Sequence, residues 1–125
     1  AMNAAAAPGS MMMFGGEPRL AVPPKGAGSG GRNGYMALVS LDILTGGQVF
    51  ASFASDGRDN GETAGAIVDL GSKRRLLEAR IPIEERMVRY DSHKVFEKSG
   101  DLIMTDITEA NVSDLALLIT PHETP

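Results

Sequence analysis

Apolar positions along this chain form short runs separated by glycine, proline and acidic residues. The run 49–54 consists of apolar and small side chains over the length of a strand, a pattern typical of a strand covered on both faces. A shorter run at 19–22 lies between prolines, which end a strand or confine it to an edge. The last strand candidates are 102–104 and 115–119.

Helical segments are predicted from three- and four-residue apolar spacing and from end signals. They are 35–43, 64–70, 72–79, one that starts at Pro82 and one that runs from Asp91 to Lys98. Proline suits a first helical turn, and the acids Glu84 and Glu85 complement the helix dipole there. Glycine residues mark the predicted C-terminal ends of these helices, because glycine readily adopts the left-handed conformation that ends many helices.

This order of strands and helices predicts an α/β layered domain with a mixed, mostly parallel sheet flanked by helices. We divide the chain into a disordered lead or cloning remnant at 1–13, one domain at 14–120 and a C-terminal tail at 121–125. The lead contains four consecutive alanines and begins without helical or strand periodicity. A single domain fits because domains commonly contain about 100 to 150 residues.

Composition removes several classes of function. The 125 residues include no cysteine, which excludes a disulfide framework, a thiolate nucleophile and a cysteine-based metal site. The net charge of −4 disfavours nucleic acid as a partner, and no stretch approaches the roughly 20 apolar residues that cross a bilayer. We therefore expect a cytoplasmic protein with no bound metal, no nucleic-acid partner and no membrane partner.

The glycine-rich segment 26–31 formally matches the dinucleotide fingerprint, but the strand before it is short and ends in Pro-Pro-Lys. A Walker loop fails because Arg32 and Asn33 stand where Lys and Ser or Thr are needed. Gly30 and Gly31 at a helix N-terminus expose amides, and a neighbouring guanidinium adds a bidentate anion partner. A flexible glycine loop with a surface arginine explains the same residues, and both interpretations stay open.

The acidic turn 55–61 follows the buried strand directly, at the strand end where open α/β sheets place ligands. A calcium loop is excluded because Arg58 occupies a position that needs an oxygen ligand. Arg32 and Asp56 either face one crevice at this strand end or form an ordinary ion pair. His93 stands too close in sequence to Ser92 for a catalytic triad, which is assembled by tertiary geometry.

Four blocks occur in a fixed order along the chain. They are Gly15-Gly16-Glu17, Gly30-Gly31-Arg32-Asn33, the segment 55–59 with 64–69, and the segment 91–96 with 100–102 and 111–115. Together they resemble the MOFRL domain, the C-terminal part of the glycerate 2-kinases, some of which are labelled hydroxypyruvate reductases. The resemblance covers Gly15 to about Ile119.

The resemblance implies a domain that closes against a larger N-terminal α/β domain, with ATP and D-glycerate between them. It also implies that Arg32 binds the anionic substrate or the transferring phosphoryl group, and that Asp56 is a catalytic polar residue. The anion-binding candidates are Gly30, Gly31, Arg32, Asn33, Gly57, Asp59 and Asn111. Asp106 and Glu109 depart from the family's glycine- and proline-rich loop and add negative charge where a phosphate would lie.

The larger domain does not fit within 125 residues. We therefore predict a free-standing MOFRL-like domain that binds a small anionic metabolite or a partner chain and is not catalytic alone, with no cofactor of its own. One alternative is part of a glycerate kinase that uses ATP and magnesium, completed by a separate N-terminal kinase-like chain or by homo-oligomerisation. Another alternative is a self-associating interaction module.

Overall fold

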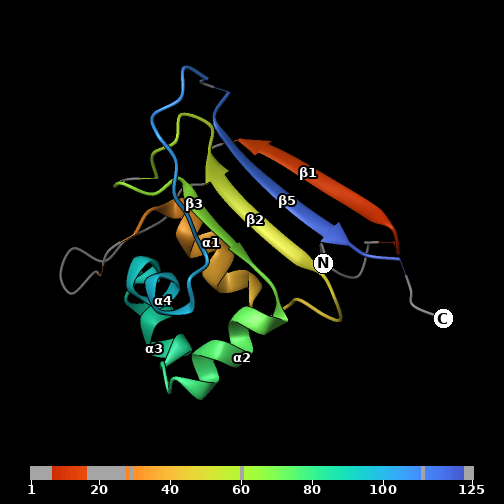
Figure 1. Cartoon of the computed structure of the whole chain (residues 1–125), viewed down its shortest axis with the longest axis vertical. Coiled ribbons are helices and arrows are strands. Elements are labelled where there is room, and N and C mark those ends of the chain that lie inside the picture. Colours follow the sequence, from red (N-terminus) through yellow and green to blue (C-terminus); the bar gives the residue numbers. More distant parts are fainter. Residues whose placement is uncertain (1–6, 17–27, 29, 60, 111, 123–125) are drawn as a thin grey trace.

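The computed structural model describes residues 7–16, 28, 30–59, 61–110 and 112–122. The described elements are β1 (Ser10–Gly16), α1 (Arg32–Ser40), β2 (Val49–Ala54), β3 (Gly65–Val68), α2 (Leu70–Glu78), α3 (Ile83–Val88), α4 (Ser92–Ser99), β4 (Leu102–Ile103) and β5 (Asp114–Thr120). Helices α1 to α4 gather on one side of the sheet (Figure 1). The described residues therefore form two layers, one of strands and one of helices.

The five strands form one sheet in the order β1-β5-β2-β3-β4, and each neighbouring pair is antiparallel. The expected mostly parallel sheet is therefore wrong, whereas the α/β layering is confirmed. Parallel neighbours need a crossover of a dozen or more residues, and the loop between Ala54 and Gly65 is too short for one. The helical stretch between β3 and β4 covers the sheet but returns the chain in the opposite direction.

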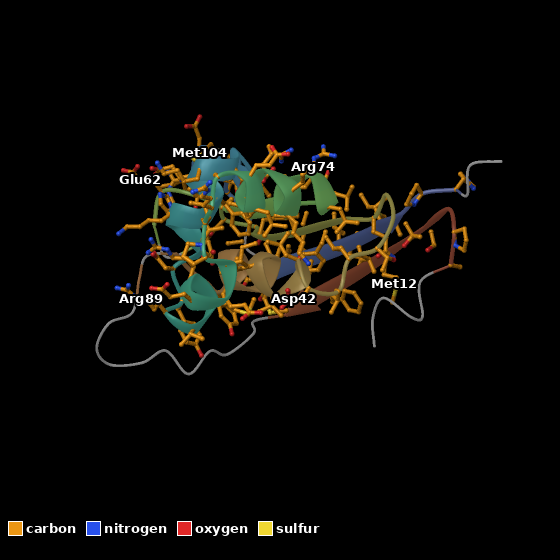
Figure 2. All side chains as sticks on the ribbon, turned by 90° about the horizontal axis from the view of Figure 1, so that it is seen from below. Met12, Asp42, Glu62, Arg74, Arg89 and Met104 are labelled. Carbon is orange, nitrogen blue, oxygen red and sulfur yellow. The ribbon has the colours of Figure 1, made fainter. Side chains whose placement is uncertain are left out.

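The hydrophobic core lies between the helices and one face of the sheet. Phe50 of β2 is opposite Val68 on one side and Leu118 on the other, and all three are at most 2% exposed. Helices supply the other half of the core through Leu38, Leu76, Val95 and Phe96. Charged side chains such as Glu62, Arg74 and Arg89 point outward, away from this core (Figure 2).

Local end signals fix the limits of the helices; those at Pro82 and Gly100 were predicted, whereas the capping box of α2 was not. The Asp69 side chain accepts a hydrogen bond from the Ser72 amide and the Ser72 hydroxyl accepts one in return, a capping box that starts α2. Gly100, at φ 81°, ends α4 in the left-handed conformation. Helix α3 follows Pro82 and carries Glu84 and Glu85 in its first turn.

The helix predicted over 64–70 is wrong, because residues 65–68 form β3. Gly65 has φ +155°, and a Cβ there would lie 1.9 Å from the Ser52 carbonyl oxygen of the neighbouring strand. Only glycine permits this approach of two backbones, and the β-branched Ile67 and Val68 favour the strand that follows.

Strand β1 corrects the C-terminal end of the predicted lead, since residues 10–13 pair with β5 rather than lying outside the fold. Met12 packs against the core, which gives this short apolar run a partner that sequence alone does not reveal. The strand predicted over 19–22 lies outside the described residues.

Candidate functional site

The N-terminus of α1, the loop between β2 and β3, and the first residue of β5 meet at one end of the sheet. The N-cap residue Gly31 has no side chain to accept hydrogen bonds from the first amides of α1. Asp59 from the β2–β3 loop accepts them instead, from the amide of Asn33 at 3.1 Å and the amide of Gly34 at 2.9 Å. The start of α1 is therefore capped by a carboxylate from a distant segment.

Asn33 extends this cap into the sheet. Its side-chain Nδ2 donates to Asp59 at 3.2 Å, and its Oδ1 accepts from the Ser52 hydroxyl at 2.7 Å. Asn33, Ser52 and Asp59 are all at most 5% exposed. A buried polar network that satisfies its own members fixes the position of α1 against β2.

The glycines before α1 allow the chain's own side chains to approach the backbone. A Cβ on Gly31 would lie 2.3 Å from Asp59 Oδ1, and a Cβ on Gly30 would lie 2.3 Å from Ser92 Oγ. Gly30 also has φ +123°, a conformation that favours glycine. Gly30 and Gly31, which were predicted to bind an external anion, therefore pack against the chain's own Ser92 and Asp59.

Arg32 forms a two-point ion pair with Asp114, the first residue of β5. Its Nε donates to Asp114 Oδ2, and its Nη2 donates to Oδ1 at 3.2 Å. The Asp114 side chain is 5% exposed, whereas that of Arg32 is 39% exposed. The buried carboxylate thus orients a guanidinium that solvent still reaches.

A polar cavity of about 40 Å³ lies beside this ion pair. It is lined by Arg32, Ala54, Ser55, Asp56, Arg58, Ser113 and Asp114. The Asp56 carboxylate accepts a hydrogen bond from the Arg58 amide at 2.9 Å, and Arg58 Nη1 donates to the Thr105 carbonyl oxygen at 2.8 Å. Arg32 and Arg58, from different segments, therefore line one small cavity together with the exposed Asp56.

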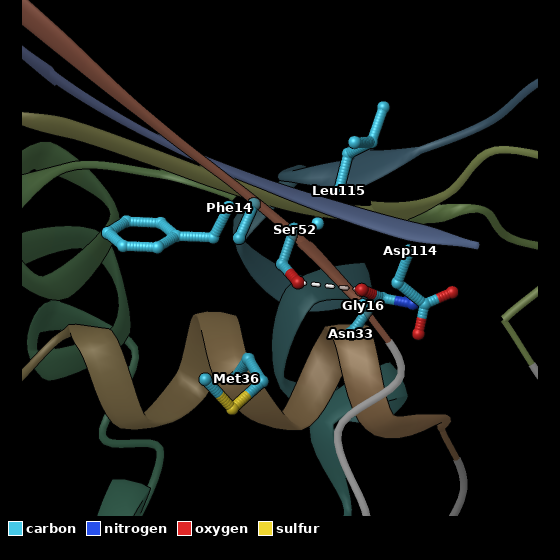
Figure 3. Close-up of a pocket in the computed structure, with 9 residues that line it drawn as sticks. Phe14, Gly16, Asn33, Met36, Ser52, Asp114 and Leu115 are labelled. Carbon is cyan, nitrogen blue, oxygen red and sulfur yellow. Dashed lines mark hydrogen bonds between the residues drawn. The ribbon is translucent and has the colours of Figure 1, made fainter. Parts of the chain in front are cut away.

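A second cavity, about 300 Å³ in volume, lies between the ends of β1 and β5 and the first turns of α1. Its lining is mostly apolar, with Phe14 on one side and Met36 on the other (Figure 3). The hydrogen bond between Ser52 and Asn33 crosses its floor, and Asp114 lines both cavities.

The predicted site residues separate into two groups. Arg32 and Asp56 line the polar cavity, whereas Gly30, Gly31, Asn33 and Asp59 form the capping network beside it. Gly57, at φ +89°, packs against the Asp106 carbonyl oxygen, and Asn111 lies outside the described residues. The roles of these residues in binding and catalysis remain predictions.

Sequence reasoning did not place Arg58 or Asp114 in the site. Arg58 counted only as a residue that excludes calcium, although its place two positions after Asp56 puts it in the same turn. Asp114 belongs to the last of the four sequence blocks, and it is the single charged residue in the five described strands. A lone acid at the start of an apolar strand was the signal that could have revealed it.

Tyr35 of α1 stacks on Tyr90, with ring centroids 4.6 Å apart. Burial raises the pKa of Tyr35, and the neighbouring Tyr90 adds to the shift through charge repulsion and a side-chain hydrogen bond. Tyr35 is therefore a neutral phenol at ordinary pH and brings no negative charge to this end of α1.

Among the residues that the structure describes, no three His, Asp or Glu side chains are grouped so as to hold a metal ion. No helix in the same part of the chain is long and apolar enough to cross a membrane.

These features define a two-layer α/β domain with a polar site at one end of an antiparallel sheet. The model of the MOFRL family matches residues 10–114, and the chain belongs to this family. A D-glycerate 2-kinase from Thermotoga maritima is 39% identical over 113 residues, and a glycerate 2-kinase from Pyrococcus horikoshii is 31% identical over 114 residues. Similar proteins from Agrobacterium vitis carry the hydroxypyruvate reductase name at 32% identity.

Solved structures from the same two organisms share the fold of this chain. A Pyrococcus horikoshii protein matches 93% of this chain with a TM-score of 0.87 at 29% identity, and a glycerate kinase from Thermotoga maritima matches 90% with a TM-score of 0.83 at 34% identity. The two matches cover 27% of each of those chains, and the two kinase sequences above are covered over 26% of their lengths. This chain therefore spans about a quarter of the length of these relatives.

Proposed function

We propose that this chain forms one wall of a glycerate 2-kinase type of site and binds the carboxylate or phosphoryl group of a small anionic metabolite through Arg32. The observation that carries the proposal is the polar cavity that Arg32 and Arg58 both line. The names of the relatives, D-glycerate 2-kinase and glycerate 2-kinase, suggest glycerate as the metabolite.

The chemistry of the cavity matches a hydroxy acid. Guanidinium groups bind carboxylate oxygens in a bidentate manner, and the exposed Asp56 carboxylate is placed to accept a hydrogen bond from a hydroxyl group. Asp114 neutralises part of the charge of Arg32, so we expect weak binding, with a dissociation constant of roughly millimolar size. A hydroxyl group beside the anionic group would favour glycerate over a simple anion.

The dimensions of the cavity limit what this chain does alone. A volume of about 40 Å³ accommodates one small polar group, because a single water molecule already needs about 10 to 15 Å³. A nucleoside triphosphate does not fit there, and the described residues offer no grouped metal ligands for its magnesium. We therefore infer that the described residues by themselves hold no ATP and transfer no phosphate.

A second candidate follows from the length of the relatives. Because the chain matches only 26% of the Thermotoga and Pyrococcus kinases, it would serve as part of a phosphate-transferring enzyme if another polypeptide supplied the remainder. In that case Arg32 and Asp56 would act on the same glycerate group in a closed cleft.

The test is a titration of the 125-residue chain with D-glycerate, followed by NMR or calorimetry. We expect weak saturable binding, and we expect Arg32→Lys or Arg58→Gln to weaken it by about tenfold, because the bidentate fork is lost. Lysine at position 32 keeps a positive charge beside the buried Asp114, so the variant retains its ion pair. Arg74→Gln on α2 is the control, since Arg74 is exposed and does not line the cavity.

Equal binding by the wild type and the cavity variants would refute the proposal. The same samples, assayed with ATP and magnesium, address the second candidate. Phosphoglycerate produced by the chain alone would show that the site is complete without further residues.

A further inference from the structure

The strands present an apolar surface on the side away from the helices. Strand register places alternate residues on this side, and the row Met13, Leu117, Ala51 and Ile67 crosses four strands. Leu115 points away from α1, on the opposite side of the sheet from Ser52 and Asn33 (Figure 3). We name this surface the outer face, and it consists of Met11, Met13, Val49, Ala51, Phe53, Ile67, Ile103, Leu115, Leu117 and Ile119.

Every side chain of the outer face is apolar, and several are open to solvent. Met11 is 57% exposed, Met13 60%, Ile67 44% and Ile119 39%. An antiparallel sheet with one wet face ordinarily alternates apolar and polar residues, whereas strands that are apolar on both faces are typical of sheets covered on both sides. No helix of the described residues lies over the outer face.

We propose that the outer face is the interface of a symmetric dimer, in which the sheets of two copies of this chain pack face to face. The proposal goes beyond the proposed function, because the outer face lies on the side of the sheet opposite α1 and the polar cavity. Twisted sheets of the same hand pack with their strands aligned to within about 30°, at a separation of about 10 Å, which suits two identical surfaces.

Charge favours a second copy as the occupant. The whole chain carries a net charge of −4, so two copies repel each other overall, but the outer face contains no charged residue. Two outer faces therefore meet without placing like charges together. The flexible side chains of Met11 and Met13 also adapt to an irregular opposing surface.

The area predicts a modest affinity. Five strands spaced about 4.8 Å apart, with about 3.3 Å per residue along each, make a face of roughly 20 by 20 Å. Two copies would bury about 1,000 Å² of accessible surface once the protruding methionines are included, near the lower limit for a specific interface. We therefore expect association in the micromolar range rather than the nanomolar range.

Sedimentation of the full 125-residue chain, from about 1 to 300 µM, tests the proposal. The expected result is a mass that rises with concentration and levels off at two chains. Met13→Glu combined with Ile67→Glu places charges at exposed positions of the outer face, and this variant should remain a single chain throughout. The matched control is Leu77→Glu with Val88→Glu, which adds the same charge at exposed positions of α2 and α3 and should still dimerise.

A cross-linking experiment uses the absence of natural cysteine in the chain. Leu117→Cys with a reagent that spans about 10 Å should give a two-chain product, because facing sheets lie about that far apart, whereas Leu77→Cys should not. Circular dichroism confirms that each variant is folded, and Met13→Lys replaces the double variant if that variant unfolds. A wild-type chain that stays monomeric, growth beyond two chains, or equal loss of association in the control would each overturn the proposal.

Discussion

Asp59 caps α1 although it lies 26 positions away from Asn33 along the chain. Capping by a residue of the same turn stabilises a helix locally, whereas this arrangement makes the first turn of α1 depend on the β2–β3 loop. The loop therefore fixes the start of α1 and, next to it, the direction of Arg32.

Replacing Asp59 by alanine tests this dependence. Three N–H groups would lose their buried acceptor, so we expect the free energy of unfolding to fall by about 2 to 4 kcal/mol in urea denaturation. Asp56→Ala in the same turn is the comparison. Asp56 is exposed, so this change should cost less than about 1 kcal/mol and should instead weaken glycerate binding. Similar losses of stability in both variants would contradict the separate roles.

Residue types alone predicted Arg32 and Asp56 as site residues, but not Arg58 and Asp114, which line the same cavity. The sequence indicated Arg32 and Asp56 because a guanidinium after two glycines and an acid after a buried strand are recognisable patterns. It did not reveal that the amides of Asn33 and Gly34 donate to Asp59, because this contact depends on how a loop folds back over a helix. Tertiary contacts of this kind leave no periodic signal in the sequence.

At the level of elements, α4 was predicted close to its observed limits, because Asp91 and Gly100 mark its ends within a few residues. The capping box at Asp69 was not read in the sequence, and the helix predicted over 72–79 begins two residues after the observed start of α2 at Leu70. Strand β1 was missed and β3 was predicted as a helix, because a run of four apolar residues fits either structure and only pairing decides between them.

Gly65 offers a test of β3. Alanine there would meet the Ser52 carbonyl oxygen at 1.9 Å and would also be held at φ +155°, so we expect a loss of about 3 kcal/mol or more in thermal denaturation. Gly61→Ala in the preceding loop is the control, because no atom lies within 4 Å of its added Cβ. If Gly65→Ala were as stable as Gly61→Ala, the close approach of β2 and β3 would be refuted.

At the level of the whole molecule, β5 joins the two ends of the chain. It lies between β1 and β2 and pairs with both along most of its length. The sequence could not give this order, because the choice of neighbouring strands depends on which apolar faces the helices cover. The antiparallel arrangement replaced the expected parallel one, because the loop between Ala54 and Gly65 is too short for a crossover.

A shortened chain tests the importance of β5. A chain that ends at Ser113 lacks the strand that connects β1 to the rest of the sheet, and we expect it to lose its cooperative thermal transition. A chain that ends at Pro121 retains β5 and the hydrogen bond from the Gly9 amide to the Pro121 carbonyl oxygen, so it should melt as the full chain does. A cooperative transition in the shorter chain would show that β2, β3 and the helices form a stable unit by themselves.

The position of β5 also has a consequence for the synthesis of this protein. A ribosome makes a chain from its N-terminus, and folding during synthesis proceeds with the segments that have already emerged. Strand β1 ends at Gly16, yet its partner β5 begins only at Asp114, so β1 emerges well before the strand with which it pairs. The apolar run at Met11 to Phe14 must therefore wait, unpaired, until β5 has been made. We expect chaperones that shield apolar segments to bind the nascent chain during that interval.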